Sequence, residues 1–319
     1  MLFWAAVLLM AGGGSAALQV MGPVRHDPPA AAAPAPQPGA AAWNGRIAEP
    51  DAALLEPGHG RPPGLLPRIA DDGRMPRQVY ARPAPARDGR PRIAVVLAGF
   101  GMAEAESRAA VALPGAVTLA VSAYGRNPEA LMAAARAAGH ELLASLPMES
   151  DGFPTDDAGR LSLLTGVAPA VNQAKLEAVM ARIQGYVGLT GASDGLRGER
   201  FAAQGGGLPR VAAELGRRGL LYLDPRLPGP GIAALPAGTF GRAVDILIDD
   251  GDPPARAAIE GRLAALERLA RERGTAVGLV GRLRPVTLER VAAWAQEAEA
   301  RGFVLVPVSA VAGEVGSPP

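Results

Sequence analysis

The stretch Gly139-His140-Glu141-Leu142-Leu143-Ala144-Ser145-Leu146-Pro147-Met148-Glu149 joins the end of a helix to a buried strand and decides the fold. A glycine just past a helix adopts the left-handed conformation at little cost, and the aliphatic run that follows it has the composition of a strand. The same junction recurs at Gly219, Gly274 and Gly302, each preceded by arginine and followed by an apolar run. This repetition predicts helix-to-strand units along most of the chain.

Strands and helices are expected to alternate from residue 93 onward. The expected strands are Ile93–Ala98, Val117–Ala123, Glu141–Leu146, Val187–Thr190, Leu220–Leu223, Ile246–Ile248, Ala276–Val280 and Phe303–Pro307. The expected helices are Glu104–Ala112, Pro128–Ala138, Pro169–Gln184, Leu208–Arg218, Pro254–Arg273 and Pro285–Arg301. Such alternation implies parallel strands joined by crossover helices. We therefore predict an α/β fold, a closed or nearly closed (β/α) barrel of about seven to eight parallel strands.

The chain before this domain has a different composition. Residues 1–24 carry no charged side chain and are dominated by apolar residues, which is typical of a signal peptide or a membrane anchor. Residues 25–90 are rich in Pro and Ala without apolar periodicity, so we expect a disordered linker there. The folded domain would then span residues 91–313. The protein would be exported, either into the periplasm or anchored in the inner membrane and facing the periplasm.

Composition excludes several classes of function. The chain has 32 Lys and Arg against 31 Asp and Glu, so its net charge of +1 gives no reason to expect a nucleic-acid partner. Cysteine is absent, which excludes disulfides, thiolate metal sites and cysteine nucleophiles. Of the three histidines only His140 lies in the expected domain, and its place at the amino end of a strand favours a structural role.

Four segments of the domain are similar, in order, to the divergent polysaccharide deacetylase family. They are Ile93–Leu97, Gly139–Glu149, Arg218–Asp224 and Leu305–Ser309, of which the second is the most specific. The resemblance implies a variant of the barrel used by metal-dependent polysaccharide deacetylases. In those enzymes a divalent ion polarises an acetamide carbonyl and activates water, while carboxylates move the protons.

The chain departs from this family where the metal ligands are expected. The family's Asp-Asp pair after the first strand is replaced by Ala98-Gly99, and its histidine before Pro147 is replaced by Ser145. Ala192 and Arg282 stand where two further family histidines are expected. A catalytic zinc site needs three protein ligands and an open position for water. We therefore expect no metal and no other cofactor, unless an unusual oxygen-rich site binds a divalent ion.

Three carboxylates remain as candidates for catalysis, because each follows a strand on the side where barrel enzymes carry their active sites. They are Asp224, Asp249 and Glu149. The alternative for Asp224 and Asp249 is that they cap loops by accepting backbone N–H groups, and Glu149 could be a solvated loop residue. Arg197 and Arg282 are candidates for substrate binding, since arginine can fork onto carboxylates. Internal Arg–Asp pairing is the alternative for Arg197, as it is for Arg200 in the same loop.

These observations lead to one expected function and two alternatives. The leading expectation is a catalytically degenerate family member linked to cell-envelope carbohydrate, which acts as a glycan- or partner-binding module. Its partners would be an envelope glycan or envelope proteins, together with the membrane if the N-terminal segment is not cleaved. The first alternative is an active metal-dependent deacetylase with an oxygen-rich site. The second is a scaffold or regulator of cell-wall hydrolases.

Overall fold

A computed structural model describes residues 43–60, 64–204, 206–229 and 234–316. The chain divides into two compact units, Met1–Trp43 and Asn44–Pro319, and all the elements below belong to the second. The predicted signal peptide or anchor over residues 1–24 lies outside the described residues. Within the described ranges, no helix is long and apolar enough to cross a membrane.

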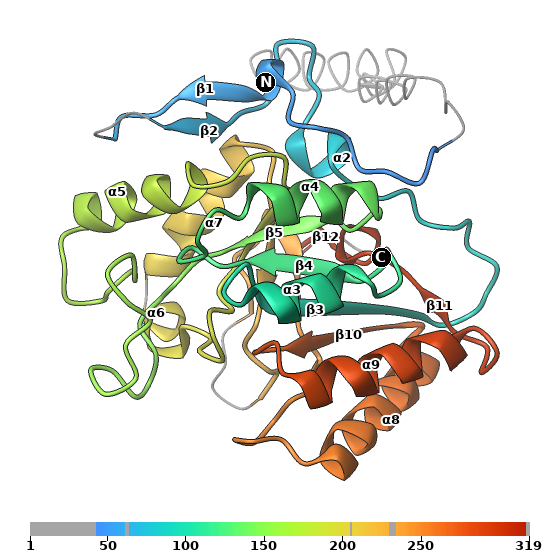
Figure 1. Ribbon diagram of the computed structural model, residues 1–319. Coiled ribbons are helices and arrows are strands. Elements are labelled where there is room, and N and C mark those ends of the chain that lie inside the picture. The colour runs from blue at the N-terminus through green and yellow to red at the C-terminus, as the bar shows by residue number, and fades with distance from the viewer. Residues whose placement is uncertain (1–42, 61–63, 205, 230–233, 317–319) are drawn as a thin grey trace, which may run out of the picture. The chain divides into compact units, whose positions relative to one another are not determined.

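The centre of the second unit is a curled, mostly parallel sheet (Figure 1). Its parallel strands are β3 (Arg92–Phe100), β4 (Thr118–Val121), β5 (Leu142–Ser145), β6 (Gly188–Thr190), β7 (Leu221–Asp224) and β8 (Phe240–Ala243), paired in that order. On the other side of β3 lie β10 (Thr275–Val280) and then β9 (Ile246–Leu247). Only Val244 and Asp245 separate β8 from β9, so this segment joins the β7 side of the sheet to the β10 side. The predicted barrel-type α/β fold is confirmed.

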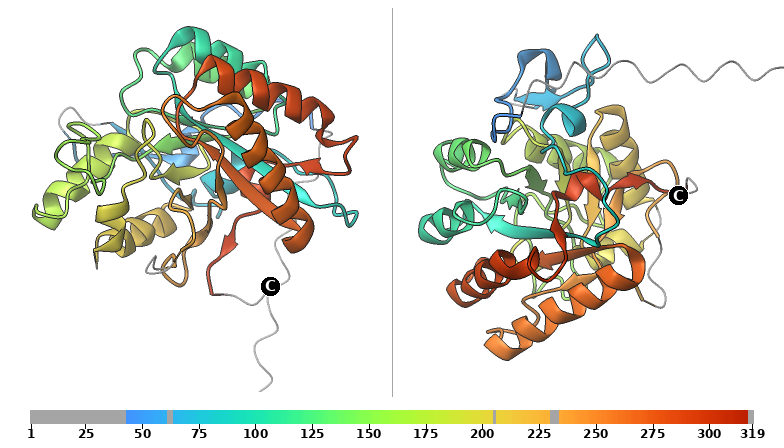
Figure 2. Two further views of the ribbon diagram at one scale, coloured as in Figure 1. Left: turned by 90° about the horizontal axis from the view of Figure 1, so that it is seen from below. Right: turned by 90° about the vertical axis from the view of Figure 1, so that its right-hand side faces the viewer.

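Crossover helices connect these strands and lie on the outside of the curled sheet (Figure 2). They are α3 (Glu104–Val111), α4 (Glu129–Ala137), α5 (Pro169–Met180), α7 (Gly207–Arg217), α8 (Arg256–Arg273) and α9 (Pro285–Ala298), with a short α6 (Glu199–Ala203) before α7. The glycines that follow α4, α7, α8 and α9 all have positive φ, between 66° and 85°. They end the helices in the left-handed conformation, as the sequence predicts.

Alternation along the strands separates two apolar clusters. Ile93, Val95 and Leu97 face outward and pack with residues of the crossover helices. Ala94 and Val96 belong to a second cluster, which takes its other members mainly from strands and from the N-terminal segment. The second cluster is therefore the interior of the curled sheet.

The structure corrects the prediction of a disordered linker over residues 25–90. Residues 25–42 lie outside the described part, but the segment that follows forms η1 (Ala52–Leu54), β1 (Leu55–Pro57), β2 (Leu65–Pro67) and α2 (Pro76–Val79). Ile47, Leu54 and Tyr80 are buried and belong to the interior cluster. This segment reaches the amino ends of the strands, where Arg82 donates from its backbone N to Glu141 Oε1 at 2.8 Å. Its buried apolar side chains do not recur with the period of a helix or a strand, so the periodic pattern of apolar residues does not predict this part of the fold.

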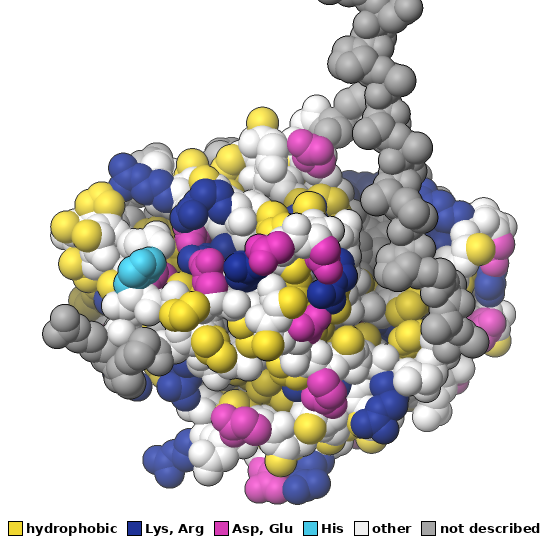
Figure 3. All heavy atoms as spheres, turned by 90° about the horizontal axis from the view of Figure 1, so that it is seen from above, with side chains coloured by type: hydrophobic (Ala, Val, Ile, Leu, Met, Phe, Trp, Pro, Cys, Tyr) yellow, Lys and Arg dark blue, Asp and Glu magenta, His cyan; other side chains and the backbone are white. Residues whose placement is uncertain are grey.

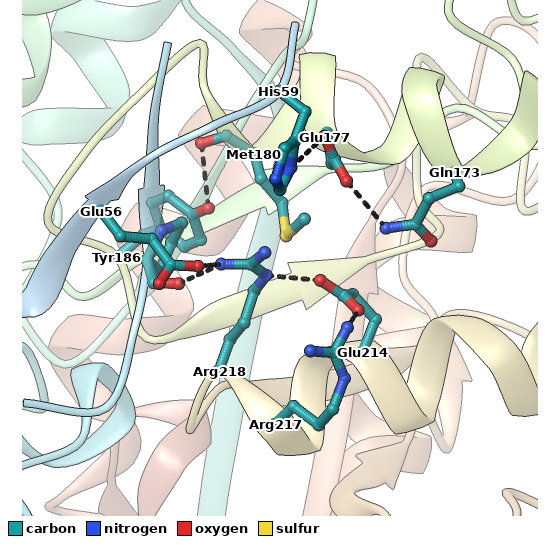
Figure 4. Close-up of polar contacts among 10 residues, drawn as sticks. Glu56, His59, Gln173, Glu177, Met180, Tyr186, Glu214, Arg217 and Arg218 are labelled. Carbon is teal, nitrogen blue, oxygen red and sulfur yellow. Dashed lines mark hydrogen bonds and ion pairs between the residues drawn. The ribbon is translucent and has the colours of Figure 1, made fainter. Parts of the chain in front are cut away.

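Arg218, directly after α7, connects the β1–β2 hairpin to that helix (Figure 4). Arg218 Nη1 donates to Glu56 Oε1 and to the Pro67 carbonyl, both at 2.7 Å, and Arg218 Nε donates to Glu214 Oε1 at 2.6 Å. The side chains of Arg218 and Glu214 are only 7% and 4% exposed. This buried pair fixes the guanidinium that bonds to the hairpin, and Leu66 of β2 is itself buried, so the hairpin packs as an integral part of the unit.

The chain returns to the amino end of the sheet near its C-terminus. The predicted strand Phe303–Pro307 is shorter than expected, because only β11 (Val304–Leu305) pairs, with the start of β3. It is followed by η2 (Val308–Ala310) and by β12 (Gly313–Glu314), which is antiparallel to β8. His140 has the predicted structural role, since its side chain is fully buried and its ring nitrogens contact the carbonyls of Val117 (2.7 Å) and Val111 (3.1 Å).

Candidate functional site

The carboxyl ends of the parallel strands form the mouth of the barrel, where enzymes of this architecture place their active sites. At this level the interior carries small side chains. Ala98 and Ala192 belong to the interior cluster, and alternation from Leu143 places Ser145 there too. The Ser145 hydroxyl is buried and has no hydrogen-bond partner among the described residues. Three of the positions where the resemblance implies metal ligands, Ala98, Ser145 and Ala192, therefore carry only methyl or hydroxymethyl groups.

A segment of residues 191–198, which we call the strap, crosses this mouth. It leaves β6 and meets the end of β10, where Gly195 N donates to the Gly281 carbonyl at 3.0 Å. Arg282 Nε also donates to the Asp194 carbonyl at 2.9 Å. Strands β6 and β10 are not neighbours in the sheet, because β5, β4 and β3 lie between them on one side and β7, β8 and β9 on the other. The strap thus spans the mouth from one wall to the opposite wall.

Asp249 caps the end of β10. Its Oδ1 accepts from Gly281 N at 2.8 Å and its Oδ2 accepts from Arg282 N at 2.9 Å. Burial raises the pKa of Asp249 above its usual value, although the two backbone N–H groups act against this rise. The structure thus shows the loop-capping arrangement that the sequence left as an alternative, and both carboxylate oxygens already have partners.

Asp224 forms a buried ion pair that the sequence did not identify. Arg226 Nη2 donates to Asp224 Oδ2 at 2.7 Å and Arg226 Nε donates to Oδ1 at 3.0 Å, in a fork-like pair. The two side chains are 4% and 2% exposed. Asp224 also lines a hollow of about 720 Å³ with Arg242 and Glu314, whereas Asp249 caps the end of β10. Asp224 and Asp249 therefore do not converge on one point.

Glu149 is held at the side of the mouth by the loop before α5 and by α6. Its Oε2 accepts from Thr165 N (2.6 Å) and Thr165 Oγ1 (2.8 Å), and Arg200 Nη1 lies 3.4 Å from its Oε1. Burial raises the pKa of Glu149, but the hydrogen bonds from Thr165 and Arg200 outweigh this effect and leave the pKa below its usual value. Glu149 is therefore not the solvated loop glutamate that the sequence allowed.

The two arginines proposed for substrate binding are paired within the protein. Arg197 Nε donates to Glu199 Oε1 at 3.0 Å. Arg282 Nε lies 3.3 Å from Asp194 Oδ1, and its Nη1 donates to Asp252 Oδ2 at 3.1 Å. For Arg197 the sequence left internal pairing as the alternative, although with an aspartate rather than the glutamate observed. For Arg282 the sequence offered no such alternative.

The fold implies a divalent metal, but the side chains present do not form a site for one. Among the residues that the structure describes, no three His, Asp or Glu side chains gather in a group that could hold a metal ion. Glu149, Asp224 and Asp249 are each engaged by a different part of the chain, and the predicted oxygen-rich arrangement of these three is not formed. The donor set at the mouth therefore does not fit the family's metal.

Comparison with known proteins agrees with this fold. The model of the divergent polysaccharide deacetylase family matches residues 95–312, about two thirds of the chain. The crystal structure of uncharacterized protein ATU2773 from Agrobacterium tumefaciens C58 is similar, with 34% sequence identity and a TM-score of 0.70. The match covers 78% of this chain and 99% of that one. Since 78% of 319 residues is about 249, more than the 225 residues from 95 to 319, this match extends into the segment before residue 95. No curated protein matches the sequence. The chain belongs to the divergent polysaccharide deacetylase family.

Proposed function

We propose that this protein is a non-hydrolytic member of its family that acts by binding a protein partner in the cell envelope. The observation that carries the proposal is the composition of the mouth. Where the family's metal ligands are expected, the chain has Ala98-Gly99, Ser145, Ala192 and Arg282. The strap crosses the same mouth and hydrogen-bonds to the opposite wall. The chain therefore has the family's fold without the residue types that would bind a catalytic metal at these positions.

Surface composition favours a protein partner over a glycan. Sugar rings are commonly held against exposed aromatic faces, which combine apolar area with a π-system. The large apolar side chains that are exposed on the described residues are Trp43, Leu65, Met102 and Val171, so no exposed large aromatic belongs to the described part of the folded unit. The face shown in Figure 3 carries no large patch of one charge sign, because acidic and basic side chains are interleaved on it. A glycan-binding module remains the second candidate, supported by family membership.

The proposed location in the envelope rests on the sequence of residues 1–24, which has the composition of a signal peptide or anchor. The linker before the folded unit is shorter than the sequence alone suggests, because residues from about 44 onward belong to that unit. The distance that the linker can span is correspondingly smaller.

The test combines metal content with glycan retention. Full-length protein would be analysed for zinc, manganese, magnesium and calcium beside Asp224→Ala and Asp249→Ala, and its sedimentation with insoluble peptidoglycan would be measured. We expect no stoichiometric metal in any of the three proteins and no saturable sedimentation. One metal per chain that is lost in Asp249→Ala would contradict the proposal in favour of a hydrolase. Saturable sedimentation would instead favour the glycan-binding module.

A further inference from the structure

The strap has few anchors on the far wall of the barrel. One main-chain hydrogen bond joins Gly195 N to the Gly281 carbonyl, and Arg282 adds a hydrogen bond and an ion pair to Asp194. The side chains of Arg282 and Asp194 are 37% and 67% exposed, so their ion pair is the kind that contributes least to stability. The hold on the far wall is therefore weak compared with the buried pairs elsewhere in the protein.

The strap is also a structural unit of its own. Ser193 N donates to the Leu196 carbonyl and Leu196 N donates to the Ser193 carbonyl, both at 2.9 Å, which closes a tight turn within it. Gly195 and Gly198 have φ values of 82° and 66°, a region that glycine enters freely. The turn could keep its internal hydrogen bonds while its contacts with β10 break.

Beneath the middle of the strap, the barrel mouth offers few side chains that could hold the strap in place. The two ends of the strap are held, since Gly191 and Gly198 lie against Met148 and Ala192 is buried. Beneath its middle, Ala98 and Gly281 offer little side-chain bulk, and the buried Ser145 hydroxyl has no partner among the described residues. Small groups give few packing contacts to lose, so separation from this surface is less costly than separation from a tightly packed core.

We propose that residues 191–198 form a strap that opens and closes the barrel mouth, with Arg282 as its latch. In the closed state Arg282 connects the strap to β10 through Asp194 and ties the same point to Asp252. Opening breaks the Gly195–Gly281 hydrogen bond and the Arg282–Asp194 contacts, and gives solvent access to Ser145. The device concerns access to the mouth and does not depend on which partner the protein binds.

The absence of cysteine allows a direct test, because Ser145→Cys introduces the only thiol of the chain. Its reaction rate with a small disulfide reagent reports exposure of the mouth. Thr287→Cys is the matched control probe. Thr287 is as deeply buried as Ser145 and its hydroxyl likewise has no hydrogen-bond partner among the described residues, but it lies in the first turn of α9. Each probe would be measured in the otherwise unmodified protein, with Arg282→Ala and with Arg284→Ala. Arg284 pairs with the same Asp252 rather than with the strap.

We expect Ser145→Cys to react faster than Thr287→Cys, and Arg282→Ala to accelerate it about two- to fivefold, as loss of an exposed ion pair allows. Arg284→Ala should leave the rate unchanged. Equal rates for the two thiols, or equal effects of the two arginine substitutions, would overturn the proposal, since either result means that Ser145 is reached only through general unfolding. If Ser145→Cys does not fold, hydrogen exchange of the otherwise unmodified protein decides. Residues 191–198 should then exchange faster than β6 and faster again in Arg282→Ala, and protection equal to that of β6 would refute the strap.

Discussion

Glu141 gives the protein a pH dependence that can be worked out from the structure. This side chain is fully buried at the amino end of β5, where it joins three segments of the chain. Its Oε1 accepts from Arg82 N and from the Ser309 hydroxyl, and Ser309 N lies 3.3 Å from its Oε2. Burial raises the pKa of Glu141 from 4.5 to about 7, because the charged form loses its hydration and the hydrogen bonds only partly replace it.

The raised pKa means that the folded protein keeps a proton on Glu141 that the unfolded chain releases. The stability from this group is therefore fully present below pH 4.5 and is lost as the pH rises through 7. A shift from 4.5 to about 7 corresponds to about 3 kcal/mol in the free energy of unfolding. Glu141→Gln cannot ionise, while its amide oxygen can still accept hydrogen bonds from Arg82 and Ser309, so the variant should lack this loss.

The assay is urea unfolding of wild type and Glu141→Gln at several pH values between 4.5 and 8. The quantity compared is the free energy of unfolding of the wild type minus that of Glu141→Gln. This difference should fall by about 3 kcal/mol as the pH rises across this range. Glu299→Gln is the control, because the side chain of Glu299 is 87% exposed, and its curve should stay parallel to that of the wild type. Parallel curves for Glu141→Gln and wild type would refute the assignment of a raised pKa to this carboxyl.

Three further substitutions test the packing by the same urea assay at one pH. Leu54→Ala should cost about 2–5 kcal/mol in the free energy of unfolding, because the Leu54 side chain is fully buried in the interior cluster. Leu65→Ala is the control and should cost much less, because the Leu65 side chain is exposed. Equal costs would argue against an integral N-terminal segment. Asp224→Ala should cost about 3–5 kcal/mol because it removes one member of a buried, forked ion pair, and a loss below 1 kcal/mol would contradict the buried pair. Gly188→Ala should be strongly destabilising, since its Cβ would lie 2.1 Å from a main-chain oxygen of β7, and a wild-type midpoint would show that the β6–β7 register is wrong.

Local sequence patterns predicted the crossover architecture well. The glycines at 139, 219, 274 and 302 end helices with positive φ because each follows a helix whose last turn needs a left-handed residue. The strands after them were predicted because they are aliphatic runs of the right length. The N-terminal segment was missed for a physical reason. Ile47, Leu54 and Tyr80 are separate side chains that fill the interior from a Pro-rich stretch with no regular period.

The sequence predicted where the candidate site residues lie along the strands, but not which residues they would contact. The sequence located Asp224, Asp249 and Glu149 at strand ends, yet the direction of each side chain depends on contacts that are distant in sequence. Asp249 meets the backbone of residues 281 and 282, and the strap meets β10 through a bond between residues 195 and 281. No local pattern encodes such pairings. The Asp224–Arg226 pair is the exception, because its two residues lie only two positions apart at the end of a strand.

Acetate release tests the loss of hydrolysis most directly. Full-length protein would be incubated with N-acetylated glycan oligomers in the presence of zinc, manganese, magnesium or calcium, and the acetate produced would be measured against a sample without protein. The account predicts no acetate above that background with any of the four ions. Multiple turnovers with one of the ions, lost in Asp249→Ala but kept in Asp250→Ala, would show that the mouth supports hydrolysis and would contradict the account.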